Sequence, residues 1–198
     1  MSALSRARRS AVCFLLVFSF SLYLFSSPPR ILLITLVSSL IHEAAHILTA
    51  KLFGREIHAF RFSFTGYRPD LGSGGAFSCA AICFAGPLSN VALIFMSFLT
   101  LGKSSSAAGE IAGINLCLAL FNLCVLPGSD GEGIARAFLC SVIKKRAAEA
   151  VVNILCFFFS FSFFLLFSYR FFITGTGFFP FFCSFAFLLS STSRFLQE

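Results

Sequence analysis

Long apolar runs, separated by short polar or Gly- and Pro-containing segments, make up most of this sequence. A run of about twenty apolar residues is long enough for a helix to cross the hydrocarbon core of a bilayer. The runs predict six membrane-spanning helices, at about residues 11–26, 31–53, 76–99, 110–126, 150–169 and 177–190. No soluble domain of useful size fits between them, so we expect one all-α polytopic membrane domain over residues 1–198.

Two segments need a separate interpretation. The first run follows Arg6, Arg8 and Arg9, which also suits a signal peptide. We favour a retained helix, because no small-x-small cleavage site precedes the prolines that end the run. Residues 58–65 alternate polar and apolar with a period of two, and turn-forming Gly and Pro residues follow. They predict a short β-strand or hairpin at the membrane surface, between the second and third spans.

Composition agrees with a membrane protein. The chain is 58% hydrophobic and 12% charged, with a mean hydropathy of +0.91, whereas soluble domains have about 25% charge. The eight Cys form no CxxC pair, and most lie inside apolar runs. We therefore expect small buried hydrophobes rather than disulfides or a cysteine metal site. We interpret the many Phe of the last two runs as lipid-facing.

The net charge of +7 carries topological information. With the N-terminus in the cytoplasm, only Arg30, Lys103 and Arg170 of the fifteen Lys and Arg residues fall in outside loops. Cytoplasmic loops are enriched in Lys and Arg, so both termini are predicted to be cytoplasmic. Since the basic residues lie in short loops, we expect no nucleic-acid partner.

The second run carries His42, Glu43 and His46, which form an HExxH motif. A charged side chain at the bilayer centre costs roughly 2.5–3.5 kcal/mol on insertion scales, so ionisable residues there indicate a function. Residues i and i+4 share one helix face, so two imidazoles can bind one Zn²⁺ while the Glu acts as general base. The motif predicts zinc bound by His42 and His46, with Glu43 as the catalytic residue.

Asp130 is the best candidate for a third ligand. A catalytic zinc usually has three protein ligands. The second and fourth spans both run from outside to inside in the predicted topology. His46 lies five residues before Lys51, roughly 7–8 Å from the cytoplasmic end at about 1.5 Å per residue, and Asp130 follows the last turn of the fourth span. We expect the three ligands to meet near the cytoplasmic face.

Three motifs together carry a family resemblance: His42-Glu43-Ala44-Ala45-His46, Gly86-Pro87-Leu88-Ser89-Asn90, and Asn122 with Asp130-Gly131. In order and spacing, residues 31–140 resemble the site-2 protease family of intramembrane zinc metalloproteases. The small, six-span members of this family include the stage IV sporulation protease that processes a sigma-factor precursor. This chain differs in two places, with Val125 where the family's first proline would be, and Glu132, which adds a carboxylate near the metal.

The resemblance implies one Zn²⁺ per chain, held by His42, His46 and Asp130. It also implies catalysis by Glu43 and a role for Asn122 at the active site, although a plain interhelical hydrogen bond is the alternative for Asn122. Asn90 is a weaker candidate of the same kind, and Gly86-Pro87 is interpreted as a packing or kink feature. The predicted strand has Phe60, Phe62 and Phe64 as candidate substrate-binding residues, because a strand edge can pair with an unwound substrate.

The expected function is an intramembrane zinc metalloendopeptidase in a bacterial cell membrane, cleaving membrane-tethered or single-span proteins near the cytoplasmic face. The sporulation subgroup would imply a pro-sigma factor as substrate and an inhibitory membrane partner. A zinc transporter is one alternative, but the polar residues cluster near one face instead of crossing the spans. A catalytically inactive membrane binding module is the other, and the intact set of site residues argues against it.

Overall fold

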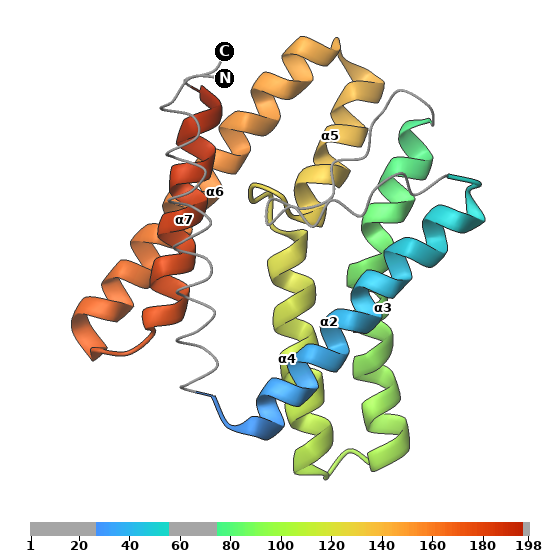
Figure 1. Ribbon diagram of the computed structural model, residues 1–198, viewed down its shortest axis with the longest axis vertical. Coiled ribbons are helices and arrows are strands. Elements are labelled where there is room, and N and C mark those ends of the chain that lie inside the picture. Colours follow the sequence, from blue (N-terminus) through green and yellow to red (C-terminus); the bar gives the residue numbers. More distant parts are fainter. Residues whose placement is uncertain (1–26, 56–74, 196–198) are drawn as a thin grey trace. The chain divides into compact units, whose positions relative to one another are not determined.

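In the computed structural model, the described residues are 27–55 and 75–195, and within these ranges the chain is entirely helical, with no strand (Figure 1). The helices are α2 Pro29–Leu52, α3 Ala76–Leu101, α4 Ser106–Leu123, α5 Asp130–Val142, α6 Lys145–Thr174 and α7 Phe178–Phe195. The predicted first span, and the predicted strand with Phe60, Phe62 and Phe64, lie outside the described residues. They stay predictions.

Four helices are long and apolar enough to cross a membrane, namely α2, α3, α4 and α6. A helix satisfies its own backbone hydrogen bonds, which is why an apolar run in a hydrocarbon environment becomes a helix. The 24 residues of α2 span about 36 Å at about 1.5 Å per residue. The apolar part of α7 is shorter, covering Phe178–Thr192. The helical membrane character predicted from the sequence is confirmed for these spans.

The fourth span ends earlier than predicted. The sequence predicts a helix to residue 126, but α4 ends at Leu123 and Cys124 is extended, with φ −64° and ψ 143°. Pro127 disfavours helical backbone in the residue before it. The hydroxyl of Ser129 then forms hydrogen bonds with backbone groups that are no longer in the helix. It donates to the carbonyl oxygen of Cys124 at 2.6 Å and accepts the N–H of Leu126. The chain therefore turns between α4 and α5, and Asp130 becomes the first residue of α5.

The described chain divides into two compact units, which we describe separately. In the unit from Pro28 to Ala148, α3 packs against α2, α4 and α5. Figure 1 shows α2 and α4 running in one direction and α3 in the other. Asn115 of α4 donates a buried hydrogen bond of 3.0 Å to Ser38 of α2. Small buried residues such as Ala112 and Ala119 let the helices approach closely.

Phenylalanine rings join α6 and α7 in the other unit. Phe181 of α7 stacks on Phe171 of α6 with ring centroids 4.8 Å apart, and Phe185 lies 5.7 Å from Phe164. Such ring pairs stabilise a helix contact beyond the area that they bury. The interpretation of these Phe residues as lipid-facing is therefore wrong for the rings between the two helices, although others, such as Phe172, are exposed.

Candidate metal centre

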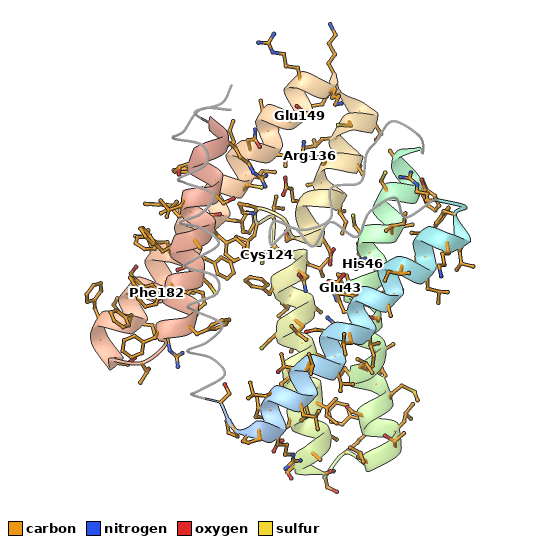
Figure 2. All side chains as sticks on the ribbon, viewed as in Figure 1. Glu43, His46, Cys124, Arg136, Glu149 and Phe182 are labelled. Carbon is orange, nitrogen blue, oxygen red and sulfur yellow. The ribbon has the colours of Figure 1, made fainter. Side chains whose placement is uncertain are left out.

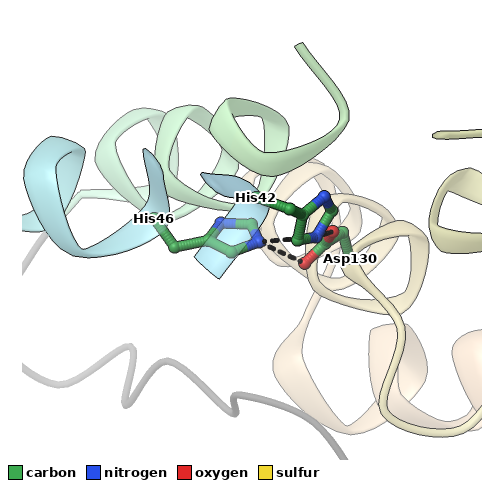
Figure 3. A group of neighbouring side chains, drawn as sticks. All are labelled: His42, His46 and Asp130. Atoms are coloured by element: carbon green, nitrogen blue, oxygen red, sulfur yellow. Dashed lines mark hydrogen bonds and ion pairs between the residues drawn. The ribbon is translucent and has the colours of Figure 1, made fainter. Parts of the chain in front are cut away.

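Three side chains from two helices converge on one point in the Pro28–Ala148 unit (Figure 3). Nε2 of His42 lies 3.1 Å from Oδ2 of Asp130, and Nε2 of His46 lies 3.2 Å from Oδ1. The two Nε2 atoms are 3.2 Å apart. The structure thus brings together the three residues that the sequence predicts as ligands.

The spacing of these atoms fits a small divalent cation. With metal–ligand bonds of about 2.0–2.1 Å, ligand atoms at the corners of a tetrahedron lie about 3.3–3.4 Å apart. The two imidazole nitrogens, 3.2 Å apart, come close to this value, and each lies 3.1–3.2 Å from a different oxygen of the Asp130 carboxylate. The Asp130 side chain is only 14% exposed, and a cation held between its carboxylate and the two imidazoles would balance its buried charge. Two imidazoles and a carboxylate are a donor set found in zinc sites.

Both histidines face α3 because they are four residues apart on α2. Their rings meet edge to face, with centroids 4.8 Å apart. Gly86 of α3 makes room for them, since a Cβ there would lie closer than 3.0 Å to Nε2 of either ring. The sequence interpretation of Gly86 as a packing or kink feature missed this contact. The position of Gly86 in the Gly-Pro-x-x-Asn motif was the sequence feature that could have indicated this contact.

The other ring nitrogen of each histidine also has a partner on α3. Nδ1 of His46 donates to the carbonyl oxygen of Ile82 at 2.7 Å. Because a carbonyl only accepts, the proton of the neutral ring must be on Nδ1, which leaves the lone pair of Nε2 for a cation. Nδ1 of His42 lies 3.1 Å from Nδ2 of Asn90, a contact that is fully buried.

The turn between α4 and α5 positions Asp130. Ser129 caps α5 by accepting the N–H of Glu132. A Cβ at Gly131 would collide with the carbonyl oxygens of Leu123 and Cys124, so this position needs glycine. Burial alone would raise the pKa of the Asp130 carboxyl, but the neighbouring imidazoles of His42 and His46 lower it. The carboxylate form, which binds cations, is therefore favoured.

Glu132, which the sequence analysis expects to add a carboxylate near the metal, is not among the three grouped ligands. Its side chain is buried, and Oε2 accepts the backbone N–H of Gly128 at 2.6 Å. Oε1 accepts from Arg136, one turn further along α5, at 2.8 Å. A buried carboxylate needs such partners to offset its desolvation. Glu132 therefore ties the turn before Asp130 to α5.

No protein-family model matches this chain, and no curated protein matches it. Arguments about function therefore rest on the site itself.

Glu43 and Asn122, the other predicted site residues within the described ranges, are not among the three grouped ligands. Glu43 follows His42 on α2, about 100° further around the helix, and its side chain is exposed. Figure 2 labels it beside His46. Nδ2 of Asn122 donates to the carbonyl oxygen of Leu118 within α4, at 3.1 Å. The structure therefore does not bring Asn122 into the ligand group, and this hydrogen bond lies within one helix rather than between two.

Proposed function

We propose that this protein is a membrane-embedded zinc metalloendopeptidase. The observation that carries the proposal is the convergence of His42, His46 and Asp130, whose ligand atoms lie within 4.8 Å of one another, in a unit that contains helices long and apolar enough to cross a membrane. The HExxH motif supplies a carboxylate beside the first of these ligands. Buried ionisable residues in a membrane protein are costly, and their clustering at one point supports a site rather than chance.

The metal and Glu43 have separate roles in the proposed peptide hydrolysis. When bound, zinc polarises a water molecule and lowers its pKa to about 7. In this proposal Glu43 takes a proton from the attacking water, whose oxygen forms a bond to the carbonyl carbon of the substrate. As the C–N bond breaks, Glu43 returns that proton to the leaving amine. Its exposed position on α2 leaves this carboxylate open to an incoming peptide.

The substrates that we propose are membrane-tethered or single-span proteins, because both histidines of the site lie on α2, a helix long and apolar enough to cross a membrane. The distribution of Lys and Arg supports cleavage near the cytoplasmic face. An ion pathway is less well supported. Between the site and the Arg30–Glu110 ion pair of 3.1 Å, helices α2, α3 and α4 carry no acidic, basic or histidine side chain. A transporter needs such groups along its path.

The test uses the full chain, purified and reconstituted in liposomes with a single-span substrate. We expect the wild type to contain one zinc per chain and to cleave. Glu43→Gln should keep the zinc but lose about 10²–10⁴-fold in cleavage rate, the usual contribution of a general base. His46→Ala should lose both metal and activity.

Three results would count against the proposal. They are a wild type that holds no zinc, a Glu43→Gln variant that cleaves as fast as the wild type, and transport of zinc across the liposome membrane without cleavage of any substrate.

A further inference from the structure

Asn90 is a buried polar residue that the proposed reaction does not use. It lies on α3 with no exposed surface, and Nδ2 is 3.1 Å from Nδ1 of His42. Its other polar atom, Oδ1, has no hydrogen-bond partner in the described part of the chain. Buried polar atoms are seldom left unpaired, so an acceptor in this position needs an explanation.

The tautomer of His42 supplies that explanation. A neutral imidazole carries one proton, and the nitrogen that binds a cation must be the other one. Nε2 of His42 faces the other two ligands, so Nδ1 must carry the proton and donate it to an acceptor. For His46 this acceptor is the carbonyl oxygen of Ile82. For His42 the group at Nδ1 is the amide of Asn90.

An amide serves either tautomer, because its two ends are nearly the same in shape and exchange places by a 180° rotation. With Nδ2 toward His42, Nδ1 accepts and the ring proton is on Nε2. With Oδ1 toward His42, Nδ1 donates, Nε2 is free for a cation, and the buried Oδ1 gains a donor. Hydrogen-bond partners of this kind orient metal-binding histidines.

We propose that Asn90 is a positioning residue of the metal centre, whose Oδ1 accepts the Nδ1–H of His42 and so directs Nε2 toward a bound divalent cation. The inference rests on the metal centre of the proposed function but not on proteolysis. It explains why the motif on α3 places its Asn four residues after Gly86, since from one helix face Gly86 adjoins both imidazoles and Asn90 contacts that of His42.

The test measures Zn²⁺ affinity by chelator competition on the purified full chain, with no substrate present. Asn90→Ala should weaken Zn²⁺ binding by about 10–100-fold, the usual effect of losing such a partner. Asn90→Asp, whose carboxylate can only accept, should restore most of that loss. Asn115→Ala is the matched control, because Asn115 is equally buried in the same bundle but bonds to Ser38 and to the carbonyl oxygen of Ile111. Its affinity should stay within about threefold of the wild type.

Visible absorption of bound Co²⁺ gives a second readout, because it reports the ligand field. The spectrum should change in Asn90→Ala and stay unchanged in Asn115→Ala. Equal losses of affinity in Asn90→Ala and Asn115→Ala would overturn the proposal, and so would an Asn90→Asp protein that folds but binds as weakly as Asn90→Ala. If Asn90→Asp does not fold, the two alanine variants decide the question. A wild type that binds zinc without cleaving peptides would refute the protease and leave this role standing.

Discussion

At Gly86, only a hydrogen atom separates the backbone of α3 from the two imidazoles of α2. Every other side chain would place a Cβ in the space that Nε2 of His42 and Nε2 of His46 now occupy. The backbone at Gly86 is held rigidly, because this residue is in the middle of α3. The imidazole rings that face it define the site, so they cannot move away without changing it. The metal centre therefore depends on a residue that contributes no ligand.

Gly86→Ala is predicted to abolish stoichiometric zinc binding while the protein remains folded, because one ring must turn away from the added methyl group. Zinc content per purified chain and the thermal unfolding midpoint would check this. Gly113→Ala is the matched control, since a Cβ at this exposed position of α4 meets nothing within 4 Å. Normal zinc content in Gly86→Ala would show that the rings can adjust.

At the scale of single elements, the junction between α4 and α5 positions Asp130. The α4 helix ends before Pro127, and Ser129 caps α5. Asp130 is therefore the first residue of a new helix, and its carboxylate contacts His42 of α2. Glu132 holds the same turn through Gly128 and Arg136. The carboxylate of Asp130 is placed by this set of local hydrogen bonds rather than by the end of a membrane span.

Ser129→Ala is predicted to lower the free energy of unfolding by about 1 kcal/mol, the usual cost of a lost N-cap, and also to weaken zinc binding. Denaturant unfolding and chelator competition would measure the two effects. Ser105→Ala removes the N-cap of α4, where the serine accepts the N–H of Ala108 far along the chain from the site. It should affect stability alone. An equal change in zinc affinity in both variants would contradict a local role for the turn.

For the molecule as a whole, the site joins α2 and α5, which are distant in the sequence and both pack against α3. A cation that binds the folded chain and not the unfolded chain stabilises it by mass action, by about 4 kcal/mol at a thousand times its dissociation constant. Loading the site should therefore stabilise the bundle.

Zinc addition is predicted to raise the thermal unfolding midpoint of the detergent-solubilised full chain, and a chelator should reverse the rise. The comparison is with Asp130→Ala, which keeps the helices but lacks the carboxylate and should respond little to zinc. Should Asp130→Ala gain as much thermal stability from zinc as the wild type, the stabilising site would have to lie elsewhere.

The sequence by itself predicted the long apolar helices and the three ligands of the candidate site. Apolar runs become helices because their backbone groups have no other hydrogen-bond partners in an apolar medium, and the spacing of His42 and His46 places both on one face of such a helix. Even the approach of Asp130 could be expected, from the shared direction of the second and fourth spans.

Only the tertiary structure decided which groups surround these ligands. Runs that are apolar all round do not encode which faces meet. Only the packing of α3 therefore reveals the contacts of Gly86 and Asn90 with the imidazoles. The folded turn before α5 likewise reveals the hydrogen bonds that Glu132 accepts from Gly128 and Arg136. The end of α4 at Leu123 likewise depended on the hydrogen bonds of Ser129, which compete with one more helical turn.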